Sequence, residues 1–236
     1  MDSLLLTLKL AFISTCILLI ISTPVAWLLA HKQFRGKALI EALIALPLVL
    51  PPTVLGFYLL IALGPDGPGG WVAGLWGDRT LAFSFTGLVI GSVIYSLPFV
   101  VQPLQSGFIL IGKHPLQVAA TLRSSFMDAF RHVILPLAKP AYITAATLGF
   151  AHTLGEFGVV LMIGGNIPNE TQVVSIAIFE QVETMNYSSA HSLSAILLML
   201  SFTMLAVIYR NRSRSLNKQS TNNTNHTNNS GGSGLL

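Results

Sequence analysis

Charged residues are scarce in this chain of 236 residues. Asp, Glu, Lys and Arg together make up 9% of the sequence, whereas hydrophobic residues make up 52%. A soluble globular domain carries about 25% charged residues, because its surface must be solvated by water. The composition therefore excludes an ordinary soluble fold. A mean hydropathy of +0.68 indicates instead a chain whose surface faces lipid.

Several other sequence features are missing. A single cysteine, Cys16, excludes a disulfide within the chain. The start at Met1 lacks the basic region and cleavage site of a secretory signal peptide, so we expect the first apolar run to be retained. The chain has no G-x-x-x-x-G-K-S/T motif, so it is not expected to be an enzyme that hydrolyses ATP. Its histidines do not show metal-ligand spacing, and we expect neither a metal site nor a cofactor bound by this chain.

Long apolar runs dominate the rest of the sequence. A helix needs about 20 mostly apolar residues to cross the hydrocarbon core of a bilayer. Runs of this kind cover Leu4–Ala30, Ala38–Leu63, Leu81–Ile111, Ala141–Ile163 and His191–Tyr209. They predict an all-α integral membrane protein with about five transmembrane helices within residues 1–215. Residues 216–236 form a polar tail rich in Asn, Thr, Ser and Gly, which we expect to be disordered.

Basic residues are concentrated on one side of the predicted membrane. The segments His31–Lys37, Gly112–Lys139 and the stretch after Tyr209 carry three, four and four of the 13 Lys and Arg residues. In the loops Gly64–Thr80 and Gly164–Ala190, the charged residues are acidic apart from Arg79. Because Lys and Arg favour the cytoplasmic side, this pattern predicts an external N-terminus and a cytoplasmic C-terminus in a bacterial-type inner membrane.

The basic segment Lys113–Leu137 contains a short predicted helix. Pro115 suits the first turn of a helix. Small and apolar residues then recur on one face, namely Leu116, Ala119, Ala120 and Leu122. Such a face on a short helix outside the membrane favours docking into a groove of a partner protein. An ordinary interfacial linker helix would show the same pattern, so both interpretations remain open on these residues alone.

Two stretches within the apolar runs are unusual for lipid-facing helices. Pro47, Pro51 and Pro52 each remove a backbone donor, and the carbonyls that they free need a protein or water partner. They predict a broken helix that lines a cavity, with a simple packing kink as the alternative. Glu156 lies between Gly155 and Gly158, and an ionisable residue there is expected to face the bundle interior or water. It could form hydrogen bonds in a gate or lock two helices together.

The segment at Lys113–Leu137 resembles the EAA loop of ABC-importer permeases. The pattern of that loop is E-A-A-x-x-x-G, followed after nine residues by a hydrophobic residue, x and L-P. Aligned from Leu135-Pro136, Gln117 takes the Glu position, Val118-Ala119 take the two Ala positions, Arg123 takes the Gly position and Val133 the hydrophobic one.

The resemblance implies that this helix is a coupling helix that sits in a groove of the ATP-binding subunit. Gln117 lacks the carboxylate of the family pattern, so a salt bridge would become a neutral hydrogen bond. Arg123 must adopt a backbone conformation that Gly allows freely, which costs about 1 kcal/mol where φ is positive. The residues expected to couple to the ATPase are Gln117, Val118, Ala119, Ala120, Thr121, Leu122, Arg123 and Ser124.

Two further stretches resemble molybdate permeases. Leu46–Gly56 reads LPLVLPPTVLG, and Leu154–Gly158 with Met162–Pro168 reads LGEFG and MIGGNIP. The resemblance implies a type I ABC-importer permease fold that carries molybdate, and also tungstate. It implies a permease homodimer in the bilayer, two ATP-binding subunits that hold ATP and Mg, and an external solute-binding protein, without nucleic acid. A sulfate or thiosulfate permease, a secondary transporter and a non-transporting membrane scaffold are the alternatives.

We expect the two proline- and glycine-containing stretches to face each other or the symmetry axis and to form the gate. An apolar constriction suits a dianion, because it offers no charge that would trap the ion. Glu156 is not expected to bind the ion directly, because a carboxylate repels a dianion. The residues predicted for the gate and translocation pathway are Pro51, Pro52, Thr53, Val54, Leu55, Gly155, Glu156 and Phe157.

Overall fold

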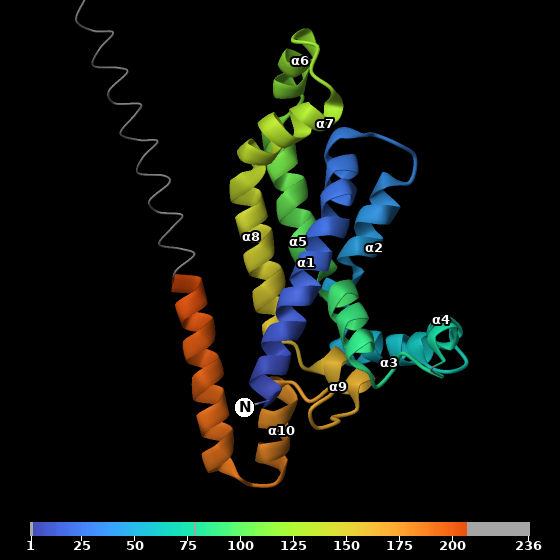
Figure 1. The fold of residues 1–236 in the computed structure, drawn as a ribbon, viewed down its shortest axis with the longest axis vertical. Coiled ribbons are helices and arrows are strands. Elements are labelled where there is room, and N and C mark those ends of the chain that lie inside the picture. The colour runs from blue at the N-terminus through green and yellow to red at the C-terminus, as the bar shows by residue number, and fades with distance from the viewer. Residues whose placement is uncertain (1, 78, 207–236) are drawn as a thin grey trace, which may run out of the picture. The chain divides into compact units, whose positions relative to one another are not determined.

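The regular elements in the computed structural model of this protein are all helices within the described residues, 2–77 and 79–206 (Figure 1). They are α1 (Asp2–His31), α2 (Lys37–Val49), α3 (Pro52–Leu63), α4 (Pro68–Ala73), η1 (Gly74–Trp76), α5 (Phe85–Ile111), α6 (His114–Thr121), α7 (Phe126–Ala129), η2 (Phe130–Ile134), α8 (Leu135–Leu154), α9 (Gly158–Gly164) and α10 (Val174–Glu183). A further apolar helix covers Tyr187–Ala206.

The chain divides into two units, Met1–Ala190 and His191–Leu236. In the second unit the structure describes helical residues through Ala206. The end of the predicted fifth span, the basic residues after Tyr209 and the predicted disordered tail at 216–236 lie outside the described residues. The fifth apolar helix begins at Tyr187, four residues before the predicted start at His191.

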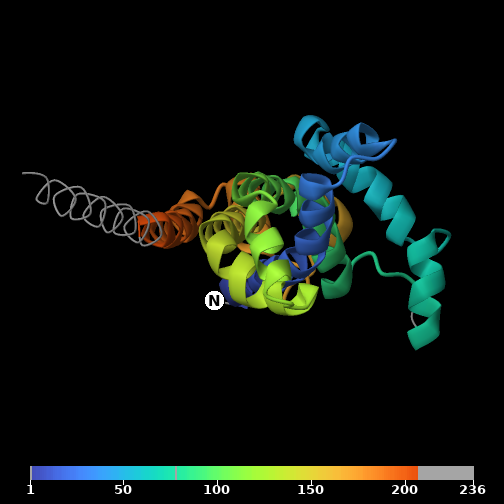
Figure 2. The same cartoon turned by 90° about the horizontal axis from the view of Figure 1, so that it is seen from above.

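Three long helices form the centre of the first unit. α1, α5 and α8 run side by side, and each packs against the other two (Figures 1 and 2). Their shared core contains fully buried side chains such as Leu18, Val100, Leu104 and Phe108. A second cluster joins α1 and α5 to α3, α9 and α10 through Leu10, Leu88 and other apolar residues. All three helices also present exposed apolar side chains, as expected for helices in a bilayer.

The second apolar run is broken, as the prolines predicted. α2 ends at Val49, α3 begins at Pro52, and the two axes meet at 112°. Leu50 and Pro51 between them have extended backbone torsions. Pro52 occupies the first turn of α3, where its missing N–H removes no helical hydrogen bond. Within residues 2–77 and 79–206, four helices could thus cross a membrane, or five if α2 and α3 together count as one span.

The predicted bounds of the fourth span, Ala141–Ile163, are wrong at both ends. A continuous helical segment starts at Phe126, passes through η2 and α8, and stops at Leu154. Pro136 and Pro140 both lie within α8. The π turn η2, just before α8, accommodates the Pro136 ring. After Leu154 the chain turns, and residues 158–164 form the separate short helix α9.

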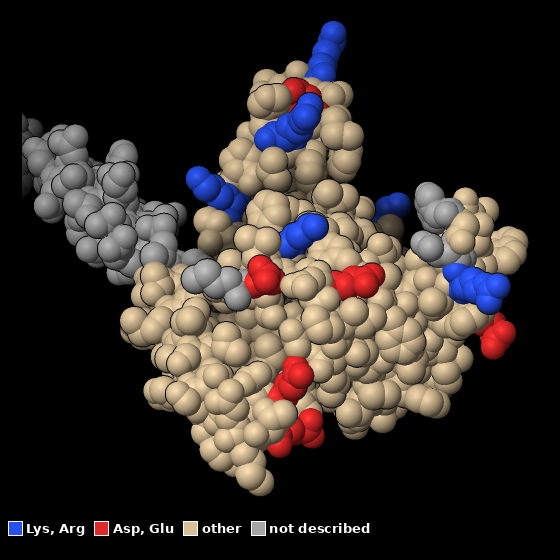
Figure 3. All heavy atoms as spheres, turned by 60° about the horizontal axis from the view of Figure 1, so that its bottom comes forward, with Lys and Arg blue, Asp and Glu red and all other residues tan. Residues whose placement is uncertain are grey.

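The two ends of the bundle differ in charge. α6 and α7 lie at one end and α9 and α10 at the other (Figure 1). Near α6 and α7 the described residues include seven Lys and Arg side chains, Lys32, Arg35, Lys37, Lys113, Arg123, Arg131 and Lys139. In Figure 3 most Lys and Arg side chains lie in the upper part of the view and most Asp and Glu side chains below them, with Lys or Arg side chains also beside acidic ones in the centre and at the right.

Candidate coupling loop and translocation gate

The short helix α6 ends in a backbone turn that requires a positive φ. The Ser124 N–H donates to Ala119 O at 3.1 Å, and the Arg123 N–H donates to Ala120 O at 3.0 Å. This pair of hydrogen bonds defines a Schellman motif, in which the first residue beyond the C-cap adopts the left-handed conformation that glycine favours. Arg123 occupies that position with φ of 58°. The Gly position of the EAA pattern therefore has a physical explanation, and the expected strain at Arg123 is confirmed.

Replacing Arg123 by glycine should stabilise the protein. The left-handed conformation costs an L-residue about 1 kcal/mol, which glycine does not incur. We expect Arg123→Gly to raise the free energy of unfolding by up to about 1 kcal/mol, measured by denaturation in detergent micelles. Ala120→Gly, three residues earlier and within α6, is the matched control and should lower it by about 1 kcal/mol. A loss of stability in Arg123→Gly would show that the arginine side chain contributes more than the strain costs.

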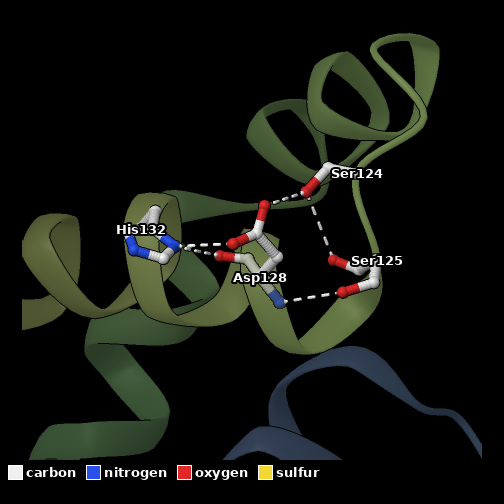
Figure 4. Close-up of polar contacts among 4 residues, drawn as sticks. All are labelled: Ser124, Ser125, Asp128 and His132. Carbon is white, nitrogen blue, oxygen red and sulfur yellow. Dashed lines mark hydrogen bonds and ion pairs between the residues drawn. The ribbon is translucent and has the colours of Figure 1, made fainter.

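A small polar network follows this turn and starts the next helix (Figure 4). Ser125 is the N-cap of α7, and its Oγ accepts the Asp128 N–H at 3.2 Å. Ser124 Oγ donates to Asp128 Oδ2 at 2.9 Å, while His132 Nδ1 lies 2.8 Å from Asp128 Oδ1. Because these side chains are exposed, each contact contributes little to stability. Together they fix the geometry of the turn between α6 and α7.

A π-helical turn, η2, connects this network to α8. In η2 the Leu135 N–H donates to Phe130 O, five residues back. Pro136 explains the wide turn, since in an α-helix its ring would clash with the carbonyl of His132. Widening the helix by one residue moves that carbonyl aside. Such π turns are frequent at functional sites, and this one lies between α7 and the apolar helix α8.

Aromatic packing holds the loop to the bundle. The Trp27 ring of α1 lies 5.4 Å from the Phe130 ring and 6.0 Å from the Phe126 ring, in edge-on geometry. Trp27 also contacts Phe108 of α5 and stacks on His31. Offset and edge-on aromatic pairs of this kind are each worth about 1 kcal/mol beyond their buried area. The loop is thus attached directly to α1 and, through Trp27, to α5, so a displacement of the loop would affect both helices.

The outward face of α6 differs from the predicted one at Leu116, which is half-buried against the helical core, and at Ala119. Ala119 is only 6% exposed and faces the interior of the loop. Gln117, Ala120 and Thr121 are exposed, as are Val118 (47%) and Leu122 (78%). Ala119 therefore supports the helix from within the chain. The surface that a partner could contact consists of Gln117, Val118, Ala120, Thr121 and Leu122, which we call the α6 face.

The two stretches predicted to form a gate do lie against each other. A Cβ added to Gly158 would come within 2.6 Å of Pro52 Cβ, and one added to Gly56 within 2.8 Å of Met162 Cβ. These small residues allow α3 and α9 to approach closely, as the glycines in the sequence indicated. Thr53 and Val54 are exposed on the first turn of α3, whereas Leu55 and Phe157 are partly buried.

Glu156 points into the protein and caps α9. Its side chain is 5% exposed, and Oε1 accepts the N–H groups of Val159 at 2.8 Å and Val160 at 3.2 Å. A carboxylate at this position satisfies two of the free donors at the start of a helix. Its backbone carbonyl accepts the hydroxyl of Ser175 in α10 at 2.7 Å. Glu156 thus links the end of α8 to α9 and α10, and its Oε2 has no hydrogen-bond partner among the described residues.

The structure also reveals polar groups in the bundle that the sequence analysis did not single out. Ser96 of α5 lies 2.9 Å from His152 Nδ1 and 3.1 Å from Thr153 Oγ1 in α8. The His152 ring stacks on Phe99, with centroids 3.9 Å apart. His152 lies four residues before Glu156 in the sequence. Two polar residues so close together in an apolar run were the signal that could have pointed to this contact.

A second polar contact occurs between α2 and α5. Gln105 Nε2 donates to Glu41 Oε1 at 2.7 Å, beside a pocket of about 200 Å³ that Leu29, Val101 and Gln102 also line. Glu41 lies within the second predicted span, as Glu156 lies within the fourth. An acidic residue in an apolar run was again the signal that could have pointed to this contact.

The sequence matches a known family model over most of its length. Residues 12–215 match the model described as binding-protein-dependent transport system inner membrane component. The chain belongs to this family, which agrees with the helical fold and the apolar spans. Among proteins similar to it, the molybdenum transport system permease protein ModB of Azotobacter vinelandii is 56% identical over 207 residues, covering 88% of this chain and 92% of the relative.

Two further relatives place the chain within a broader group. The ModB protein of Haemophilus influenzae is 40% identical over 160 residues, covering 68% of this chain and 70% of the relative. The sulfate transport system permease protein CysT of Salmonella typhimurium is 32% identical over 208 residues, covering 88% and 75%.

Solved structures support the fold. A bacterial ABC transporter that imports the acidic polysaccharide alginate superposes with a TM-score of 0.68 at 14% identity, covering 92% of this chain and 78% of that chain. The alginate transporter in complex with its periplasmic protein, which carries an alginate pentasaccharide, gives 0.70 at 13% identity, covering 88% and 76%. At such low identity the likeness shows the ABC-importer permease fold alone.

Proposed function

We propose that this chain is the membrane-spanning permease subunit of an ATP-driven importer of molybdate. The observation that carries the proposal is the 56% identity to a molybdenum transport permease over nearly the full length of both chains. Identity to the sulfate permease CysT is 32% over a similar length, which favours molybdate over sulfate. The secondary-transporter alternative is disfavoured, because the family is one of binding-protein-dependent systems.

In this proposal two copies of the chain enclose the pathway, and each binds one ATP-binding subunit through its α6 face. ATP and Mg are held by those subunits, and an external binding protein delivers the oxyanion. The solved complex of the alginate transporter with its periplasmic protein supports a partner of this kind. Closure of the ATP-binding subunits would move α6, and η2 would pass the movement to α8, which leads directly to Glu156. The pathway then alternates between the two sides of the membrane.

The gate in this proposal is formed by the α3 start and the turn after α8. In this arrangement the first turn of α3 faces the turn after α8. The residues concerned are Pro51, Pro52, Thr53, Val54 and Leu55 on one side and Gly155, Glu156 and Phe157 on the other. The contact of Pro52 with Gly158 supports the arrangement, because a closed gate needs such close approach. Glu156 is buried and positions α9. The pathway itself is then lined by uncharged groups, which do not retain the dianion.

The proposal is tested by reconstituting the permease with its ATP-binding subunits and binding protein in lipid vesicles. ATP hydrolysis is then measured with molybdate, tungstate, sulfate or thiosulfate bound to the binding protein. We expect stimulation by molybdate and tungstate and none by sulfate. Stimulation by sulfate alone would assign the chain to the sulfate permeases, and import of an anion without ATP would favour a secondary transporter.

The proposed orientation places α6 in the cytoplasm, because the basic residues gather at that end. In a Cys16→Ser background, Asp66→Cys should react with a membrane-impermeant maleimide in intact cells, and Lys113→Cys should react only after the cells are opened. Both positions are exposed, and Asp66 lies in the loop before α4. The opposite labelling pattern would reverse the proposed orientation.

A further inference from the structure

The loop between α3 and α5 carries a short helical segment with a strongly apolar outer side. α4 and η1 together cover residues 68–76. Trp71 is 86% exposed and Leu75 78%, and Val72 is also exposed. No charged residue occurs between Gly67 and Gly77. An exposed tryptophan and leucine beside each other in a loop are costly in water and need a reason.

The loop starts and ends at the same level of the molecule. Leu63 is the last residue of α3, and its carbonyl oxygen accepts the N–H groups of Leu81 at 3.0 Å and Ala82 at 3.2 Å. Thr80 Oγ1 donates to the same carbonyl at 3.0 Å. α5 begins at Phe85, directly after this clamp. The end of the α2–α3 pair and the start of α5 are therefore held together, at the boundary of the apolar helices.

α4 packs against the end of α3. A Cβ on Gly69 would come within 2.5 Å of Leu63 Cα, and a Cβ on Gly70 would meet the backbone oxygen of Pro65. Ala73 is buried on the same side of α4. The small residues face α3, so the bulky apolar side chains face the surroundings at the depth where α3 ends. α5 is long and apolar enough to span a membrane, and it begins at Phe85 directly after the clamp. The start of such a helix is expected at the interface between lipid and water.

We propose that α4 and η1 form an interfacial anchor, with Trp71 and Leu75 inserted between the lipid headgroups and the upper acyl chains. Tryptophan is enriched at this depth because its ring is apolar and its N–H can remain hydrated. A protein partner is less suitable, since about 800 Å² per partner is needed for a stable interface, and the exposed apolar side chains that the structure describes here are those of Trp71, Val72 and Leu75. The anchor would hold α3, whose first turn carries residues of the proposed gate, at a fixed depth while other helices move.

Tryptophan fluorescence in lipid nanodiscs tests the anchor independently of any transported ion. The full chain with Trp27→Phe and Trp76→Phe retains Trp71 alone. Its emission is measured in phosphatidylethanolamine and phosphatidylglycerol, with brominated acyl chains as the lipid-side quencher and iodide as the aqueous one. We expect a large loss of emission with brominated lipid and a small loss with iodide. The matched control retains Trp27 alone, which packs inside the aromatic cluster and should respond weakly to both.

Two outcomes would overturn the anchor. Strong quenching by iodide with none by brominated lipid would place Trp71 in water, and resistance to both would mean that a second copy of the chain covers it. Should the double variant fail to assemble, a spin label at Leu75→Cys in a Cys16→Ser background gives the same answer. Its collision rate with oxygen should exceed that with a water-soluble nickel chelate, and the reverse would also refute the proposal.

Discussion

A tryptophan in place of Ala120 should abolish uptake while leaving the permease folded and inserted. Ala120 is exposed on the α6 face, so the larger side chain has room in the isolated chain. In the proposed complex the same position enters a groove of the ATP-binding subunit, where overpacking costs about 3 kcal/mol. That cost corresponds to a roughly hundredfold weaker association. Binding of the ATP-binding subunit to the purified permease and molybdate uptake by cells are the two measurements.

Ala120→Ser is the matched control, because it adds a single oxygen and should leave uptake near the wild-type rate. Ala119→Trp should behave differently, since Ala119 is 6% exposed within the chain and the substitution would damage the loop itself. We expect that variant to be less stable in detergent as well as inactive. Normal uptake by Ala120→Trp would remove α6 from the interface with the ATP-binding subunit.

Glu156→Ala should destabilise the protein by about 2–3 kcal/mol, because two hydrogen bonds are lost and two buried donors are left unpaired. The donors are the N–H groups of Val159 and Val160, which Oε1 now accepts. α9 packs against α3 at the proposed gate, so loss of its cap should also reduce uptake. Thermal unfolding in micelles and uptake in cells measure the two effects separately.

Glu156→Gln distinguishes the cap from the charge. The amide oxygen can still accept both N–H groups, so we expect a cost of about 1 kcal/mol and uptake close to that of the wild type. This result would identify Glu156 as a positioning residue that locks α8, α9 and α10 together. A stable Glu156→Gln protein without uptake would show instead that the negative charge itself takes part in gating.

The residues of the coupling loop show how far sequence reasoning reaches. Pro115 and the small and apolar residues after it predicted a short helix, and α6 confirms it. The positive φ expected at Arg123 is confirmed. It could be predicted from sequence because a Schellman turn depends on local backbone geometry. The burial of Ala119 could not be predicted, since the side of a short helix that faces the rest of the loop depends on how α7 and η2 fold back onto it.

The fourth span shows where the sequence misleads. Hydropathy placed it at Ala141–Ile163, because apolar residues continue beyond Leu154 and prolines precede Ala141. The helix instead begins at Phe126, where the turn at η2 accommodates Pro136, and ends before Glu156. Hydropathy measures only composition, and a buried loop with a capping carboxylate has the same composition as part of a span.

The sequence by itself determined the class of this protein, the approximate positions of its apolar spans and the break at Pro51 and Pro52. Those properties depend on transfer of side chains into lipid and on the missing proline donor, which act locally. Only the tertiary structure decided that Gly158 meets Pro52, that Glu156 caps α9 and that Leu63 clamps the loop carrying Trp71. Such contacts join residues distant in the chain, and their partners are set by the packing of the whole bundle.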